Sequence, residues 1–480
     1  LLLEAAMTRY SSQPRRVKQS PQGNGWGNLA IAIILGGAGC VGLTLWLETQ
    51  PDGFSLDQLA KVTESVQQAA NPKTLIRTQR VDNPIAGNPQ QFSAQAANQL
   101  DQRAKQIQYY GTSVEELALQ IRQVASNDWE KARLAYSWIT QNIAYDVMMA
   151  ETRNIDDLRP ETVLARRETI CSGYANLYQA LAQALGLDVV IIEGFGRGGD
   201  FVVGDDPDIN HAWNGVKIND QWYLLDATWG AGFVNDGQFQ FKFNPHYFAT
   251  EPKQLITSHF PRESQWQLLP TSYSRLQFDQ LPALTPRFFR DQFAFNSHPT
   301  KQIRTGGELA VTLQTGPDIQ VVAKVQTQSG QTLEDYYTFS QNRNGQVTVK
   351  AAFPQPGDYK LLILSKNTNE ETYYQAIAYD VTAQGVGEPF PKTYGSFTEH
   401  QVNLISPLGR SLPLNQASYF QLQVPGAEKV MLVDRDRRQF TPLTRTGDMF
   451  TGSEVVNASN LMVAAQFPGS DKFWTLVEYD

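Results

Sequence analysis

Three residues of this 480-residue chain have the types and the order that nucleophilic catalysis needs: Cys171, His211 and Asp226. Cys171 stands directly before a run of apolar residues at helical spacing, so its thiol should lie at or near a helix N-terminus. Free backbone N–H groups and the positive end of the helix dipole stabilise an anion there, which would lower the pKa of the thiol. The alternative is a buried structural cysteine, which is the commoner situation of a lone thiol.

The histidine and the aspartate lie on two β-rich runs, residues 211–218 and 221–229, with the two residues 219–220 between them. This spacing predicts a β-hairpin. If the pairing continues along the whole second run, His211 and Asp226 are diagonal neighbours on one face, about 7–8 Å apart at the backbone. An imidazole there can take the thiol proton, and the carboxylate can fix its tautomer and stabilise the imidazolium.

Each of these residues also has a plain structural explanation, since a strand histidine is often only hydrogen-bonded and an aspartate at a strand end often caps a loop. The residue types of all three, their order along the chain and the shared face of His211 and Asp226 fit a nucleophile, a base and an orienting acid, which favours a catalytic triad. The remaining histidines have no comparable setting and are expected to be structural or exposed: His246, His259, His298 and His400. With two cysteines and no cysteine–histidine cluster at zinc-ligand spacing, the sequence predicts no metal and no cofactor.

Several short motifs surround these residues. They are Trp138-Ile139-Thr140, Asn142-Ile143-Ala144-Tyr145-Asp146, Cys171-Ser172-Gly173-Tyr174-Ala175, His211-Ala212-Trp213-Asn214 and Leu225-Asp226-Ala227-Thr228-Trp229-Gly230. As a set they resemble the transglutaminase-like superfamily of papain-related cysteine enzymes, and most closely its kyphoscoliosis-peptidase-like branch. A downstream stretch that includes His259-Phe260-Pro261 also looks like that branch. The resemblance covers about residues 113–270.

The resemblance implies that Cys171, His211 and Asp226 form the triad. It also implies an α+β fold in which the cysteine-bearing helix packs on an antiparallel sheet that carries the other two residues. An oxyanion donor besides the Cys171 backbone N–H is expected. Trp138 and Trp213 are weak candidates for contact with the oxyanion or the substrate, and helix packing is the alternative role of Trp138.

The first 112 residues are expected to carry no chemistry. Residues 1–28 are basic and lack apolar periodicity, which indicates a disordered tail. Residues 29–47 are uncharged and long enough for one transmembrane helix, and the preceding basic residues predict a cytoplasmic N-terminus with the bulk of the chain extracytoplasmic. A cleaved signal peptide and lipid attachment at Cys40 are alternatives, but the apolar run continues past Cys40 and favours the anchor. Residues 48–112 are predicted to form a polar helical stalk.

The rest of the chain divides into three predicted domains. Residues 113–280 form the α+β catalytic domain. Short alternating runs then replace the helical periodicity, and residues 281–385 and 386–480 are predicted to be two immunoglobulin-like β-sandwich modules. The modules are expected to position the enzyme or to bind a cell-envelope polymer or a protein partner. A spacer role is the alternative.

The formal net charge of -8 and the lack of a basic patch in the soluble part argue against a nucleic-acid partner. The sequence therefore predicts a membrane-anchored cysteine enzyme that acts on amide or peptide bonds of a protein or peptide substrate. Hydrolysis is slightly preferred to acyl transfer, since nothing marks an amine site. The alternative is a catalytically inactive scaffold or wall-binding protein.

Overall fold

The computed structural model describes residues 28–30, 34–35, 41–42, 46–48, 84–198, 209–456 and 460–480. The chain divides into two compact units, residues 1–72 and 73–480. The described pieces of the first unit are short strands, paired β1 with β4 and β2 with β3: β1 (Asn28–Ala30), β2 (Ile34–Leu35), β3 (Val41–Gly42) and β4 (Trp46–Glu48). The predicted basic tail and most of the predicted anchor and stalk lie outside the described residues. Among the described helices, none is long and apolar enough to cross a membrane.

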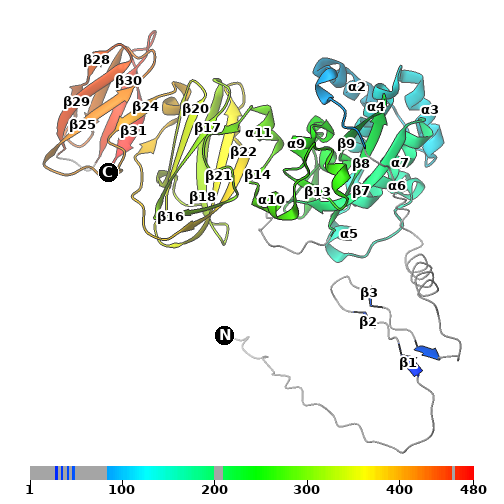
Figure 1. Ribbon diagram of the computed structural model, residues 1–480. Helices are drawn as coiled ribbons and strands as arrows, with labels where there is room; N and C mark the ends of the chain where they lie inside the picture. The colour runs from blue at the N-terminus through cyan, green and yellow to red at the C-terminus, as the bar shows by residue number, and fades with distance from the viewer. Residues whose placement is uncertain are drawn as a thin grey trace, which may run out of the picture. The chain divides into compact units, whose positions relative to one another are not determined.

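The second unit opens with an α+β domain whose first half is helical (Figure 1). Its elements are η1 (Pro89–Gln91), α2 (Ala94–Gln106), α3 (Val114–Val124), α4 (Asp128–Asn142), β5 (Ala144–Tyr145), α5 (Val147–Thr152), α6 (Pro160–Arg166), β6 (Glu168–Thr169) and α7 (Cys171–Ala184). The helical patterning predicted over residues 113–142 corresponds to α3 and α4. The hydroxyl of Ser113 accepts a hydrogen bond from the Glu116 N–H, so Ser113 caps α3 as its sequence position indicates.

A five-stranded antiparallel sheet follows, in the order β12–β9–β8–β7–β13. Its strands are β7 (Asp188–Gly196), β8 (His211–Ile218), β9 (Gln221–Leu225), β12 (Phe248–Thr250) and β13 (His259–Pro261). The elements between and after them are α8 (Ala227–Ala231), β10 (Gly232–Asn235), β11 (Gln238–Phe241), η2 (Pro245–Tyr247), α9 (Pro252–Leu255), η3 (Ser264–Gln267) and α10 (Arg275–Gln280).

The predicted hairpin is present, with the predicted turn. Asn219 and Asp220 have φ angles of 50° and 62°, the left-handed conformation at both central positions that matches the strand twist. Ile218 pairs with Gln221, and the ladder continues in register. Pairing stops at Asn214–Leu225, so the continued pairing that would place His211 opposite Thr228 does not form. The chain leaves the sheet after Leu225 and begins α8.

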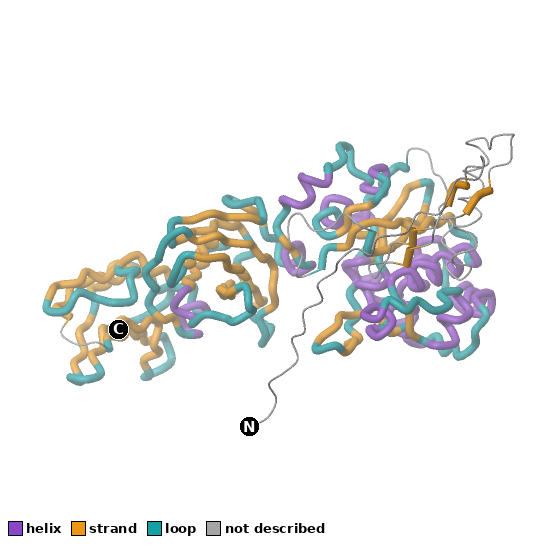
Figure 2. The backbone as a smooth tube through the Cα atoms, turned by 90° about the horizontal axis from the view of Figure 1, so that it is seen from below, coloured by secondary structure: helices purple, strands orange, loops and turns teal. Residues whose placement is uncertain are grey.

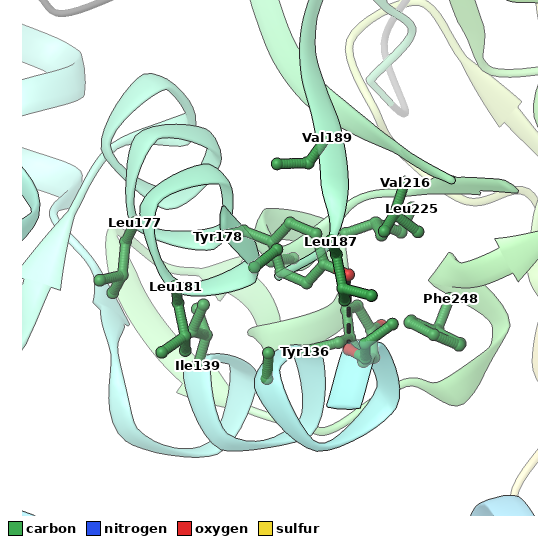
Figure 3. Packing of buried hydrophobic residues seen from close by; sticks show 14 of the residues in the cluster. Tyr136, Ile139, Leu177, Tyr178, Leu181, Leu187, Val189, Val216, Leu225 and Phe248 are labelled. Atoms are coloured by element: carbon green, nitrogen blue, oxygen red, sulfur yellow. Dashed lines mark hydrogen bonds between the residues drawn. The ribbon is translucent and has the colours of Figure 1, made fainter. Parts of the chain in front are cut away.

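The domain core lies between α7, α4 and the sheet (Figure 3). Leu177, Tyr178 and Leu181 of α7 are fully buried, and Tyr136 and Ile139 of α4 belong to the same buried cluster. Complete burial of one such side chain stabilises the fold by about 1.5–3 kcal/mol. This packing fixes the helix that begins with Cys171.

Helix α2 belongs to this core, so the stalk predicted over residues 48–112 ends before α2. Leu100 and Ala104 are buried in the same cluster. The Asp101 carboxylate accepts two hydrogen bonds from the Arg133 guanidinium of α4, at 2.8 and 2.7 Å. The sequence does not predict the packing of α2 because most residues of this helix are polar. A charged residue that forms a buried ion pair cannot be distinguished in the sequence from one exposed on the surface.

Two strand-rich modules follow (Figure 2). In the first, one sheet has the order β14–β22–β21–β18 with β16 parallel to β22, and the other β15–β17–β20–β19. Its elements are β14 (Ala283–Leu284), α11 (Pro286–Arg290), β15 (Ala294–Phe295), β16 (Gln302–Thr305), β17 (Glu308–Gln314), β18 (Ile319–Thr327), η4 (Asp335–Tyr337), β19 (Thr338–Arg343), β20 (Gln346–Ala352), β21 (Gly357–Asn367) and β22 (Tyr374–Ala383).

The second module pairs its strands in the orders β23–β31–β30–β26–β27 and β24–β25–β29–β28. Its elements are β23 (Lys392–Thr393), α12 (Gly395–Glu399), β24 (Asn403–Ser406), β25 (Gln416–Gln423), β26 (Lys429–Asp434), β27 (Gln439–Pro442), β28 (Thr444–Thr446), β29 (Met449–Val456), β30 (Leu461–Gln466) and β31 (Phe473–Tyr479). Each module has two sheets and a buried apolar cluster, as the alternating runs indicate.

Candidate active site

The thiol of Cys171 lies at the first residue of the fourteen-residue helix α7, and the residue is partly exposed. The N-cap residue, Ile170, has no side chain that could cap the helix. Strand β6, just before it, pairs with β5, so that Thr169 lies beside Tyr145. The predicted helix N-terminus is therefore confirmed, and its dipole favours the thiolate.

His211 is the first residue of β8, the strand that packs against α7. Asn214 holds the two elements together, because its Nδ2 donates to the Ala175 carbonyl at 3.1 Å and to the Val190 carbonyl at 3.2 Å. The Ala212 backbone N–H and the His211 side chain both hydrogen-bond the sulfur of Cys171. The strand thus presents two donors to the thiol.

Asp226 completes the chain of hydrogen bonds although it lies outside the β9 ladder. Its Oδ2 is 2.8 Å from Nε2 of His211, and its Oδ1 accepts from the Thr228 and Trp229 N–H groups at 2.7 and 3.2 Å as the N-cap of α8. Burial alone would raise the pKa of this fully buried carboxyl, but the charge and hydrogen bond of His211 lower it below its ordinary value. Asp226 is therefore ionised at neutral pH.

The same interactions set the protonation of the other two groups. Burial alone would lower the pKa of His211, but the Asp226 carboxylate and the hydrogen bond to Cys171 raise it to about 10. Burial alone would raise the pKa of the Cys171 thiol, but the hydrogen bond and charge of His211 bring it below its ordinary value. Since Nε2 of His211 faces Asp226, Nδ1 is the nitrogen left for the thiol. The stable pair at neutral pH is a thiolate and an imidazolium.

A second imidazole contacts the same carboxylate oxygen, and here the sequence prediction for His259 is incomplete. Nε2 of His259 lies 3.0 Å from Oδ2 of Asp226, and its Nδ1 lies 2.8 Å from the Ser258 hydroxyl. Burial lowers the pKa of His259, so the ring is neutral. Its Nε2–H then donates a hydrogen bond to Asp226, and its Nδ1 accepts a hydrogen bond from the Ser258 hydroxyl. Strand β13 brings it there by pairing His259 with Gly196.

The ligand atoms of His211, Asp226 and His259 lie within 4.8 Å of one another. Both imidazoles point a ring nitrogen at a single carboxylate oxygen, and hydrogen bonds account for this cluster. Its chemistry is that of a carboxylate which orients a base.

Cys171 and His211 face a large cleft of about 1460 Å³. Its walls include Tyr145, Trp229 and His246 from the α+β domain. Residues of the first β module also line it, among them Phe289, Arg290 and Tyr374. The cleft exceeds the usual range of about 300–1,000 Å³ for small-molecule sites.

Two ranges of the chain match known protein families. Residues 115–227 match the transglutaminase-like superfamily, and residues 275–394 match the KY-like, immunoglobulin-like domain. The chain contains a transglutaminase-like domain. The range matched to the transglutaminase-like superfamily includes Cys171, His211 and Asp226 and ends before His259.

Several curated relatives share parts of the chain. Kyphoscoliosis peptidase of Mus musculus is 29% identical over 286 residues, which are 58% of this chain and 42% of the relative. The Homo sapiens protein of the same name is 28% identical over 274 residues, which are 56% of this chain and 40% of the relative. Hillarin of Drosophila melanogaster is 28% identical over 184 residues, which are 34% of this chain and 22% of the relative. The chain thus spans about two fifths of the length of the first two relatives.

The two weak tryptophan candidates have different positions in the transglutaminase-like domain. Trp138 is fully buried, and its indole N–H donates to the Ile107 carbonyl at 3.1 Å, so it cannot also serve an oxyanion. Trp213 packs beside His211 with ring centroids 5.9 Å apart, and its indole nitrogen is buried without a hydrogen-bond partner in the described part of the chain. Trp138 therefore has a packing role, as the sequence allowed.

Tyr145 lines the cleft beside Cys171, a position that its sequence does not indicate. Its motif, residues 142–146, was noted, but nothing local shows that β5 lies beside the segment leading into Cys171. Burial and then the nearby negative charges of Cys171 and Asp226 raise the pKa of the Tyr145 phenol to about 12. The hydroxyl is therefore protonated at neutral pH and able to donate a hydrogen bond into the cleft.

Proposed function

We propose that this chain is a cysteine enzyme that cleaves amide bonds through a thioester on Cys171. The observation that carries the proposal is the hydrogen-bonded series from Cys171 through His211 to a buried Asp226, open to a cleft. The thiolate attacks the amide carbonyl carbon, and a tetrahedral oxyanion forms. The imidazolium then gives its Nδ1 proton to the amine as the C–N bond breaks, which leaves the thioester.

The second half of the reaction returns the enzyme to its starting state. Neutral His211 removes a proton from water, or from an amine, as that nucleophile attacks the thioester carbonyl. The C–S bond then breaks, and the thiolate and the imidazolium are restored. Asp226 stays ionised throughout and stabilises the imidazolium.

The developing oxyanion needs donors, and two lie at the site. The Cys171 backbone N–H is at the start of α7, and the Tyr145 phenol lines the same cleft. Each such donor typically contributes a factor of about 10²–10³ in kcat. Tyr145, and not Trp138, is the proposed second donor to the oxyanion.

Hydrolysis is preferred to acyl transfer as the fate of the thioester. The relatives from Mus musculus and Homo sapiens carry the name peptidase. The proposed substrate is a peptide or protein, and no cofactor takes part in any step.

The test is to incubate the full chain with a fluorogenic peptide-amide library, beside Cys171→Ala and Cys171→Ser variants. Wild type should release amine and show a covalent acyl adduct by intact-mass spectrometry, while both variants retain the circular dichroism spectrum and lose turnover. Turnover that persists in both variants would rule out the mechanism. A wild type that forms no adduct while its thiol stays unreactive would instead favour the inactive-scaffold alternative.

The membrane location is a separate proposal, supported by the uncharged run at residues 29–47 and the basic residues before it. Deletion of residues 29–47 should move the protein from the alkali-resistant membrane fraction to the supernatant. Recovery of the undeleted chain in the supernatant would contradict an anchor.

A further inference from the structure

The cleft that holds Cys171 has walls from two domains. The α+β domain supplies the thiol, the hairpin β10–β11 and His246, and the first β module supplies Phe289, Arg290 and Tyr374. With a volume of about 1460 Å³, it exceeds what a small metabolite needs. The β module therefore shapes the space into which a substrate must enter.

Buried contacts fix this second wall to the first. One guanidinium nitrogen of Arg197 donates to the carbonyls of Leu281 and Pro282, where the first β module begins, at 2.7 and 3.4 Å. The rings of His246 and Phe289 stack with centroids 5.6 Å apart and an interplanar angle of 10°.

The charge inside the cleft is opposite in sign to that of the chain. Its described lining contains four cationic side chains, those of Arg197, Lys242, Arg287 and Arg290, and one carboxylate, that of Glu370. Arg287 is tied to Glu370 and Asp291, and Arg197 to backbone carbonyls. The Arg290 side chain is 59% exposed but pairs with Glu370 at 3.1 Å and with Asp291 at 3.4 Å. Lys242 is exposed and faces solvent and an incoming ligand.

Apolar side chains lie beside these charges. Phe233 and Val234 of β10 are about half exposed, at 49% and 46%, and both line the cleft. Tyr374, at the start of β22, is 43% exposed and lies under the Lys242 ammonium, 4.7 Å from ring centroid to nitrogen. Exposed aromatic surface beside a cation suits a large apolar side chain that adjoins a negative charge.

We propose that the first β module completes the substrate-binding cleft, and that the cleft selects polypeptide segments carrying an acidic and a large apolar side chain near the reacting amide. Lys242 recognises the carboxylate, and Phe233, Val234 and Tyr374 contact the apolar side chain. The choice of a polypeptide rests on the proposed amide chemistry. The choice of side chains rests on the cleft lining alone.

Binding is measured by fluorescence anisotropy on the full chain carrying Cys171→Ala, so that turnover plays no part. The probes are labelled peptides with a central glutamine flanked by Glu and Phe, with Lys replacing Glu, and with Ala replacing Phe. The Glu–Phe peptide should bind roughly ten-fold more tightly than either analogue.

Charge removal by Lys242→Gln should abolish the preference for Glu over Lys, and Tyr374→Ala should reduce the preference for Phe over Ala. The matched controls are Lys324→Gln and Tyr419→Ala, both exposed and outside the cleft, which should leave both preferences unchanged. Equal binding of the three peptides, no binding of any, or preferences unaffected by the cleft variants would overturn the inference. Absence of turnover in wild type would count against the proposed function only.

Discussion

At the scale of single residues, the site depends on one carboxylate that makes four hydrogen bonds. Asp226 accepts from two backbone N–H groups and lies within hydrogen-bond distance of both His211 and His259. The backbone bonds hold the carboxylate in place, and the neutral His259 stabilises its ionised form. The imidazolium of His211, and through it the thiolate, depend on this arrangement.

His259→Ala should lower kcat/KM, and the alkylation rate of Cys171 at neutral pH, by about ten-fold or more. A hydrogen bond to a charged group contributes about 1.5–3 kcal/mol, and roughly 1.4 kcal/mol corresponds to a factor of ten. His259→Gln keeps an N–H donor and should recover part of the loss. A purely structural role for His259 would instead lower the melting temperature of both variants and leave the alkylation rate of the folded protein unchanged.

Gly196→Ala should displace His211. A Cβ atom at Gly196 would lie 2.9 Å from both Cβ and Cγ of His211, closer than packed atoms approach, so the imidazole must move. We expect at least a ten-fold lower alkylation rate at neutral pH, because the charge pair weakens with distance. Gly198→Ala is the matched control, since a Cβ there meets no atom within 4 Å. Equal loss in both variants would contradict the steric argument.

At this scale, the sequence predicts that Cys171, His211 and Asp226 meet, and the structure brings them together although Asp226 lies outside the β9 ladder. Their role as a catalytic triad stays a prediction. His259 and Tyr145 could not be assigned a role in the same way. Each reaches the site through a strand pairing with a distant or short segment, β13 with β7 and β5 with β6. No periodicity in the sequence encodes those pairings.

At the scale of elements, local sequence signals predict most helices and strands of the α+β domain correctly. They give wrong predictions where polar residues are buried. The cap at Ser113, the turn at residues 219–220 and the helix behind Cys171 follow from local chemistry. The end of β9 did not, because Asp226 is diverted to cap α8. The polar sequence of α2 predicts a stalk, because the buried ion pair between Asp101 and Arg133 of α4 cannot be recognised from the sequence.

Asp101→Ala should therefore destabilise the domain strongly. It leaves the buried guanidinium of Arg133 without its carboxylate, and breaking a buried pair from one side costs about 3–5 kcal/mol. Urea unfolding followed by circular dichroism measures the difference. The matched control is Asp128→Ala, which removes a more exposed ion pair with Lys131 and should change stability by less than about 1 kcal/mol. Similar losses in both would mean that α2 is not part of the core.

At the scale of the second unit, the α+β domain and the first β module share a buried junction. Arg197 of the α+β domain is 4% exposed, its guanidinium lies 4.0 Å from the Phe278 ring centroid, and it donates to the carbonyls of Leu281 and Pro282 at the start of the first β module. The sequence predicted the modules from their alternating runs. It could not predict that one of them lines the cleft, since that depends on how two folded surfaces meet.

Arg197→Ala should leave buried carbonyls unsatisfied, at a cost of about 1–3 kcal/mol each. We expect a lower melting temperature and a thermal transition that separates into two steps, as scanning calorimetry would record. Arg262→Ala is the control, because its side chain is 68% exposed and its pairing with Glu193 is loose, at 3.8 Å. A single transition, shifted no more than in that control, would show that the junction does not couple the domains.

The most direct test of the account is the pH dependence of Cys171 alkylation by iodoacetamide, in the full chain and in His211→Ala. The thiol has a lowered pKa, and His211 stays protonated up to a pKa of about 10. The thiolate–imidazolium pair should therefore exist from below the ordinary thiol pKa of about 8.5 up to roughly pH 10. Wild type should show a rate that has already risen at neutral pH, and His211→Ala should shift the rise to about pH 8.5 or above, since the hydrogen bond and the charge of His211 that lower the thiol pKa are then lost. Identical curves that both rise near pH 8.5 would contradict the ion pair and identify Cys171 as a structural thiol.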